Sequence, residues 1–342
     1  MNRLALGAAI VLCTLLPVAK ATDDPRLSSL LSANAARFPG KLAIYIKHLA
    51  TGQEASSDAD HAMNSMSVIK LGILAKAYQM AEKRELNLVE RVQLKRSDLI
   101  GGSGVLQFHA PGLNPTLRDL LIQMIITSDN AATDVMLERV GGLTSLNRWY
   151  VEHGFGEMRM QSTFSAYVAI IAPILTPLAR GLSEAEINAA IVGQRMGELT
   201  PAGNAAAAEL GKMETWLGVC DKFKDPGTWL GSASARSIGR LLEQMETAKL
   251  VSQASSDEMM GMLKSQQGGK RRIPMYLDTQ YVIGNKTGDF PPCIANDVGV
   301  VYLRSGPTVM VFLSDQIRGN YGEAEVRIGE IARTVAEYFD GK

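Results

Sequence analysis

The sequence predicts an α+β domain in which one antiparallel sheet joins strands from both ends of the chain. Segments of alternating hydrophobicity lie near the start, at residues 41–49, and near the end, at residues 281–313. The stretch between them has mostly helical spacing of its apolar residues. Strands and helices that are segregated in this way favour an α+β layout with a mainly helical lobe.

The first 21 residues have the pattern of a secretory signal peptide. Met1-Asn2-Arg3 gives a positively charged start, residues 4–18 are almost wholly apolar, and Ala19-Lys20-Ala21 fits a small-residue cleavage site. We therefore expect cleavage near Ala21 and a protein that is periplasmic or secreted to the extracellular space. The mature domain would cover residues 22–342, which is 342 − 21 = 321 residues, with no membrane span.

Composition excludes several kinds of partner and ligand. The chain carries 35 basic and 35 acidic residues and no basic block, so we expect no nucleic-acid partner. Its four histidines are scattered without metal-ligand spacing, so we expect no metal and no cofactor. The mature domain is expected to be a monomer that acts on a small molecule. Its two cysteines, Cys220 and Cys293, form either one disulfide, as export would allow, or two separate buried thiols.

The N-terminal half divides into short elements with clear limits. Leucines at helical spacing predict a helix over residues 24–37, which Pro39-Gly40 ends. A strand follows over residues 41–49, and a second short strand is expected before Asp60. Thr116 has the character of an N-cap. Helices are expected over residues 67–80, 117–127 and 131–140.

Residues 161–234 form a divergent, enlarged region with the weakest pattern. It contains an apolar stretch, residues 166–178, which we expect Pro173 and Pro177 to break. The pattern then becomes regular again. Helices are expected over residues 237–245, 255–264 and 323–339, and strands over residues 281–288, 297–303 and 308–313.

Three short segments carry side chains suited to acyl transfer through a serine ester. Ser67 and Lys70 are three residues apart, which on a helix puts hydroxyl and amine on one face, one turn apart. A weak nucleophile needs such a base within reach of its proton. Ser128-Asp129-Asn130 and Lys286-Thr287-Gly288 add a second hydroxyl, an amide and a second ammonium. Each segment alone is common in caps, turns and strand ends, so the prediction depends on their order and flanking sequence.

In these segments and their surroundings the chain resembles the class A serine β-lactamases, which belong to the penicillin-recognising serine enzymes. That family carries the motifs S-x-x-K, S-D-N and K-T-G. The similarity includes residues 63–71, 102–107, 116–133 and 296–302, and covers about residues 24–160 and 232–340. It implies the β-lactamase/transpeptidase-like fold, with residues 22–342 as one catalytic domain.

The resemblance implies catalytic roles for four residues. Ser67 would be the acylated nucleophile, and Lys70 would take or relay its proton. Ser128 would pass a proton to the leaving nitrogen of the opened amide, and Lys286 would hold Ser128 and the substrate carboxylate electrostatically. Two nearby lysines also lower each other's pKa, which frees a neutral amine to act as base.

The resemblance also implies substrate-binding roles. Asn130 would bond the substrate's side-chain amide, and Thr287, beside Gly288, would bind its carboxylate. The backbone N–H groups of Ser67 and Asp289 would form the oxyanion hole, which stabilises the charge that develops on the carbonyl oxygen.

Arg272 is a further binding candidate. It lies 286 − 272 = 14 residues before Lys286, where some class A enzymes carry an arginine that binds the substrate carboxylate. Its planar fork of donors suits that task. The alternative is a solvated loop arginine.

The family's deacylating glutamate is missing at its expected position. That glutamate lies within Glu-x-x-x-Asn after the second motif and activates the water that hydrolyses the acyl-enzyme. Alignment through residues 158–161 puts the glutamate at Phe164 and the asparagine at Val168. Another glutamate of the enlarged region could supply the carboxylate, although the alternative for each of them is an ordinary exposed surface residue. The candidates are Glu184, Glu186, Glu198, Glu209 and Glu214, of which Glu198 is the preferred one.

These features leave three functions open. The first is a β-lactamase-like serine hydrolase that opens a β-lactam or a related amide through a Ser67 acyl-enzyme, with slow deacylation. The second is a penicillin-binding or peptidase-like enzyme that acts on cell-wall peptide. The third is a domain that binds β-lactams without hydrolysing them.

Overall fold

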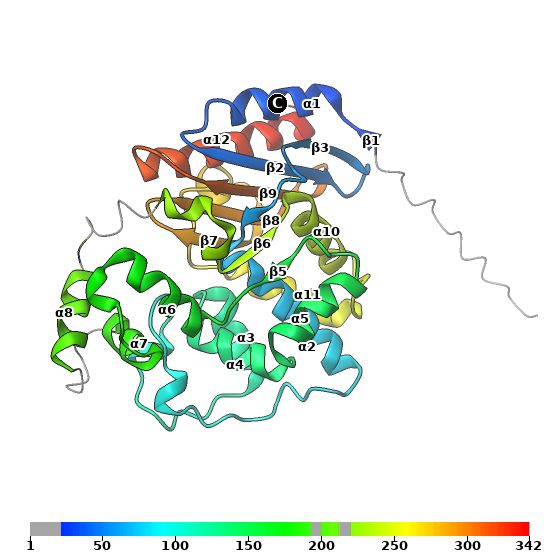
Figure 1. The fold of residues 1–342 in the computed structure, drawn as a ribbon. Coiled ribbons are helices and arrows are strands. Elements are labelled where there is room, and N and C mark those ends of the chain that lie inside the picture. The colour runs from blue at the N-terminus through cyan, green and yellow to red at the C-terminus, as the bar shows by residue number, and fades with distance from the viewer. Residues whose placement is uncertain (1–21, 193–199, 211, 213–219, 342) are drawn as a thin grey trace, which may run out of the picture.

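A six-stranded sheet forms the centre of the computed structural model, which describes residues 22–192, 200–210, 212 and 220–341 (Figure 1). The strand order is β1-β3-β2-β9-β8-β7. The strands are β1 (Thr22–Asp23), β2 (Lys41–His48), β3 (Gln53–Ser57), β7 (Val282–Phe290), β8 (Ile294–Leu303) and β9 (Gly306–Asp315). Strand β2 pairs with β9 and β9 with β8, both antiparallel, so the predicted joining of N- and C-terminal strands is confirmed.

Helices α1 (Pro25–Ala35) and α12 (Tyr321–Asp340) cover one face of this sheet (Figure 1). Leu27 and Leu31 of α1 are buried with Ile328 and Val335 of α12 in one apolar cluster. Both helices were expected, within a few residues of their observed limits. Their apolar stripes at helical spacing explain why they form and which side they bury.

The other face of the sheet packs against the helical lobe. Helices α10 (Ala235–Glu246) and α11 (Gln253–Lys264) contact the sheet directly. Below them lie α2 (Lys70–Glu82), α3 (Leu117–Ile126), α4 (Asn130–Arg139) and α5 (Gly142–Glu152). A second, three-stranded sheet with the order β4-β6-β5 connects the two parts, with β4 (Met63–Asn64), β5 (Arg159–Met160) and β6 (Gly231–Ala233).

The enlarged region contains more helix than the sequence predicted. It forms α6 (Phe164–Leu175), α7 (Glu184–Val192) and α8 (Pro201–Leu210), which lie at one side of the lobe in Figure 1. Pro173 does not break α6 but lies inside it, so that expectation was wrong. Thr163 caps the helix by accepting a hydrogen bond from the N–H of Ala166, and the helix ends at Leu175, two residues before Pro177.

Cys220 and Cys293 form a disulfide, with 5.1 Å between their Cα atoms. The alternative of two separate thiols is therefore excluded in this structure. The bond fastens the end of the enlarged region to the turn between β7 and β8. The expected signal peptide, residues 1–21, lies outside the described residues. Among the helices that are described, none combines the length and hydropathy of a membrane span.

Candidate active site

Ser67 lies in a 3-10 turn, Met66–Ile69, that runs directly into α2 at Lys70. The residue before it, Met66, has a φ of +45°, a left-handed conformation that is costly for a non-glycine residue. Such strain, of about 1–3 kcal/mol, persists where the surrounding fold enforces it. Strand β7 packs against this turn, so Ser67 is held between the sheet and the helical lobe.

Lys70 connects the first motif to the second. Its buried ammonium donates hydrogen bonds to the backbone oxygen of Ser128 at 2.6 Å, to Ser128 Oγ at 3.2 Å and to Asn130 Oδ1 at 3.0 Å. Among the hydrogen bonds of the described residues, none joins Lys70 Nζ to Ser67 Oγ, the contact that the motif spacing predicts. Burial, and then the positive charge of Lys286, hold the pKa of Lys70 well below its usual range.

The second motif lies where α3 ends and α4 begins. Asp129 is the N-cap of α4, where its Oδ1 accepts from the N–H of Ala132 at 2.9 Å. Its Oδ2 accepts from the N–H groups of Val105 and Leu106 at 2.7 and 2.8 Å, which fixes the preceding loop against the helix. Asp129 thereby holds Ser128 and Asn130 in place on either side of it. Ser128 itself has a φ of +56°.

The third motif lies on β7, at the edge of the sheet. Lys286 Nζ, fully buried, donates to Ser128 Oγ at 3.0 Å and to the backbone oxygen of Thr287 at 2.8 Å. Burial lowers the pKa of Lys286 to about 8. Gly288 allows the strand to approach the nucleophile turn, because a Cβ atom there would lie 2.7 Å from the backbone oxygen of Ser65. An edge strand leaves alternate N–H groups outside the sheet ladder, as the expected oxyanion role of Asp289 requires.

Ser67 opens into a cavity of about 400 Å³. Asn130 lines it from the second motif and Asp289 from the end of β7. Its remaining wall is mostly apolar, and α6 and α7 of the enlarged region supply much of it. The apolar lining residues are Met66, Phe164, Tyr167, Val168, Ile191, Phe290 and Pro291.

A second hollow of about 330 Å³ adjoins the first, since Ser103 and Asp289 line both. Ser128 and Thr287 also line it. Five of the expected site residues therefore line two adjoining spaces, Ser67 and Asn130 on one side, Ser128 and Thr287 on the other, and Asp289 on both.

Arg272 is neither solvated nor part of the lining of these two spaces. Its side chain is 3% exposed, so the alternative of a solvated loop arginine is wrong. Nη2 donates to Asp289 Oδ1, to Glu325 Oε1 at 3.0 Å and to Tyr321 Oη at 3.0 Å. Nη1 donates to the backbone oxygen of Asn296 at 2.8 Å. The two terminal nitrogens of the guanidinium group are thus committed to acceptors from the protein itself.

The resemblance places the deacylating glutamate at Phe164, and the ring of Phe164 faces Lys70. Lys70 Nζ lies 4.2 Å from the centre of the Phe164 ring. Of the other candidate carboxylates, Glu184 bonds Ser165, Glu186 caps the start of α7 and Glu209 pairs with Lys212. None of these three lines the Ser67 cavity. Glu198, the preferred candidate, and Glu214 lie outside the described residues.

Sequence reasoning missed Asp134, which fixes the start of α6. Its two carboxylate oxygens accept from the N–H groups of Phe164 at 2.7 Å and Ser165 at 2.8 Å. Burial raises the pKa of Asp134 to about 6. Its place four residues after Asn130, on the same face of α4, was a signal that could have been used.

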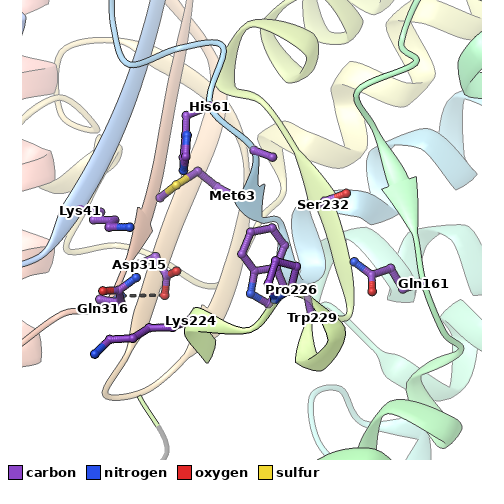
Figure 2. A pocket seen from close by; sticks show the side chains of 11 residues that line it. Lys41, His61, Met63, Gln161, Lys224, Pro226, Trp229, Ser232, Asp315 and Gln316 are labelled. Atoms are coloured by element: carbon purple, nitrogen blue, oxygen red, sulfur yellow. Dashed lines mark hydrogen bonds between the residues drawn. The ribbon is translucent and has the colours of Figure 1, made fainter. Parts of the chain in front are cut away.

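Another hollow, of about 340 Å³, lies at one end of the main sheet (Figure 2). Lys41 and Asp315 line it from β2 and β9, and Trp229 lines it from the loop before β6. It shares no lining residue with the Ser67 cavity and contains no residue of the three motifs. This hollow is therefore separate from the candidate active site.

Comparison with known proteins agrees with this arrangement. A sequence profile of the β-lactamase enzyme family matches residues 26–339. The β-lactamase BRO-1 of Moraxella catarrhalis is 30% identical over 146 residues, which are 41% of this chain and 46% of BRO-1. The match thus spans less than half of that relative's own length.

Two solved structures show the same fold. PBP-A has a TM-score of 0.70 and 17% sequence identity, with 94% of this chain and 98% of PBP-A covered. An ancestral class A β-lactamase has a TM-score of 0.69 and 20% identity, with 92% of this chain and all of that chain (100%) covered. The chain therefore belongs to the β-lactamase enzyme family and has the fold of the class A serine β-lactamases.

Proposed function

We propose that the chain is a serine hydrolase that opens a β-lactam, or a related amide, through an acyl ester on Ser67, and that it releases this ester slowly. The observation that carries the proposal is one bonded network at the cavity. Lys70 and Lys286 both donate to Ser128 Oγ, and Ser67 opens into the adjoining space. Family membership supports the same chemistry.

The proposed acylation step uses these groups in turn. Neutral Lys70 accepts the proton of Ser67 Oγ as that oxygen attacks the carbonyl carbon. The N–H groups of Ser67 and Asp289 stabilise the charge on the carbonyl oxygen. The C–N bond then breaks and Ser128 gives its proton to the leaving nitrogen. Lys70 lies 3.2 Å from Ser128 Oγ and can pass to it the proton taken from Ser67. One proton is thus moved from Ser67 to the leaving nitrogen, and both Ser128 and Lys70 return to their starting states.

Slow deacylation follows from Phe164. Hydrolysis of the ester needs a base that takes a proton from water, and such a base typically contributes about 10²–10⁴-fold to the rate. A phenyl ring cannot accept that proton. This feature also favours a second candidate function, a penicillin-binding or peptidase-like enzyme on cell-wall peptide, in which a different acceptor resolves the ester.

We also propose that residues 1–21 are a signal peptide and that residues 22–342 act as one monomeric, periplasmic or secreted catalytic domain. The charged start and apolar run of the leader support export. The Cys220–Cys293 disulfide supports it independently, because such bonds persist mainly in oxidising compartments.

Mass spectrometry tests the proposal directly. The mature protein is incubated with benzylpenicillin, and the intact mass and the modified peptide are determined. We expect one adduct per chain, on Ser67, and no adduct on the Ser67→Ala variant. An adduct that survives this substitution would show that another residue is acylated.

A further inference from the structure

We infer that the site prefers substrates whose acyl side carries a large apolar group, rather than a small or an anionic one. The inference rests on the proposed function and specifies its substrate class. Ser128, the proposed proton donor to the leaving nitrogen, lines the second hollow, so the leaving group belongs there. Ser67 and Asn130 line the cavity of about 400 Å³, so a substituent on the acyl side of the scissile bond would enter that cavity.

The helices of the enlarged region supply an apolar wall to this cavity. Phe164, Tyr167 and Val168 of α6 line it, at the i, i+3 and i+4 spacing that puts side chains on one face of a helix. Ile191 of α7 adds a fourth apolar side chain. Phe164 and Val168 stand where the family resemblance places a glutamate and an asparagine. The wall is therefore apolar at two positions where polar groups were expected.

The charges around the cavity offer no cation to an anionic acyl group. Among the lining residues that the structure describes, only Asp289 carries a formal charge. Its Oδ1 accepts from Arg272 Nη2 and from Tyr321 Oη, the latter at 3.2 Å. The ammonium of Lys70 lies 4.2 Å from the centre of the Phe164 ring, and Lys70 is not among the lining residues. A carboxylate on the acyl group would therefore lose hydration against the apolar wall without gaining a cationic partner there.

Contacts with neighbouring side chains support the wall from behind. Tyr167 Oη donates to Met66 Sδ at 3.8 Å, which connects α6 to the turn that carries Ser67. The ring of Phe290 packs edge-on against the ring of Phe223, with 4.5 Å between their centres. A cavity that is formed before the ligand enters needs little reordering when an apolar group fills it. Burial of that group then contributes to the acylation rate.

Three penicillins with one ring system and different N-acyl groups test the inference on the mature wild-type protein. The acyl groups are acetyl, 5-methylhexanoyl and glutaryl, of which the last two match in size and shape and only glutaryl ends in a carboxylate. The second-order rate of Ser67 adduct formation is measured by mass spectrometry and divided by the rate of hydroxide-catalysed ring opening. We expect the 5-methylhexanoyl compound to acylate at least about tenfold faster than either of the others, because each fully buried methylene contributes about fourfold.

Matched variants of α6 separate the cavity wall from a general effect on the helix. Val168→Asp puts a carboxylate on the wall and should lower the rate ratio of the 5-methylhexanoyl to the acetyl compound about tenfold. Val168→Thr keeps the shape of the side chain and should lower the same ratio about threefold, which provides a test if the first variant does not fold. Ile170→Asp is the control, because Ile170 is 45% exposed and does not line the cavity. Its ratio should stay within twofold of wild type, and thermal melting checks the folding of each variant.

The outcomes distinguish the inference from the function on which it rests. Equal corrected rates for the acetyl and 5-methylhexanoyl compounds, or for the 5-methylhexanoyl and glutaryl compounds, would overturn the inference and leave the proposed function intact. Equal changes of the ratio in Val168→Asp and Ile170→Asp would overturn it as well. If none of the compounds acylates Ser67, the proposed function is contradicted, and the inference with it.

Discussion

Burial, a ring contact and hydrogen bonds together fix the side chain of Lys70. It is fully buried, it lies beside the ring of Phe164, and its three hydrogen bonds all go to the second motif. To act as base it must be neutral, and its lowered pKa favours the neutral form relative to an ordinary lysine. The motif spacing predicted a hydrogen bond between Lys70 and Ser67, but Lys70 donates instead to Ser128 and Asn130, which the fold brings from another part of the chain.

The pH dependence of acylation should have an alkaline limit set by Lys286. Burial lowers the pKa of this lysine to about 8, so it is charged below that pH and neutral above it. The charged form holds Ser128, so the rate of adduct formation should fall about tenfold per pH unit above pH 8. Lys286→Arg keeps the positive charge to higher pH, so in this variant the rate of adduct formation should not fall above pH 8. A wild-type rate that stays constant to pH 10 would show that the charge is not needed.

Phe164→Glu should shorten the life of the acyl-enzyme. The new carboxylate would stand at the position that faces Lys70, where it could take a proton from water. We expect the adduct mass to decay up to about 100-fold faster than in wild type, the lower end of what a general base supplies. Phe164→Gln is the matched control, because a glutamine side chain has the same shape as glutamate and cannot act as a base. Equal decay in both variants would mean that Phe164 does not occupy the water site.

At the scale of elements, Asp129 joins α4 to the loop before the second motif. Three backbone N–H groups donate to its buried carboxylate. Asp129→Ala leaves all three without this acceptor and should lower the free energy of unfolding by about 2–4 kcal/mol. Asp129→Asn keeps one acceptor oxygen and should lose less. Urea unfolding measures both, and equal stability of wild type and Asp129→Ala would contradict this account.

The sequence predicted the regular elements well and the enlarged region poorly. Thr116 caps α3 as expected, and it also exchanges hydrogen bonds with Asp119 in a capping box. The sequence signal failed at Pro173, because α6 buries Tyr167, Ile171 and Ala172 in apolar clusters, and this packing offsets the hydrogen bond that a proline cannot donate. Tertiary packing of this kind is not visible in a local pattern.

At the scale of the whole molecule, the sheet brings the third motif to the first two. Ser67 and Lys286 are far apart in sequence, and the pairing of β2 with β9 and β9 with β8 places β7 at the edge nearest the nucleophile turn. The joining of N- and C-terminal strands in one sheet followed from the segregation of strands to both chain ends. The position of Arg272 did not follow, because its partners Asp289 and Glu325 come from β7 and α12, and only the assembled fold unites them.

We expect the protein to acylate Ser67 faster than it hydrolyses the resulting ester. Stopped-flow measurement with a chromogenic cephalosporin at saturating concentration tests this most directly, with the adduct mass followed in parallel. We expect a burst of about one chromophore per chain, a slow steady phase, and an adduct whose amount matches the burst. Rapid, linear turnover from the first moment with no detectable adduct would contradict it.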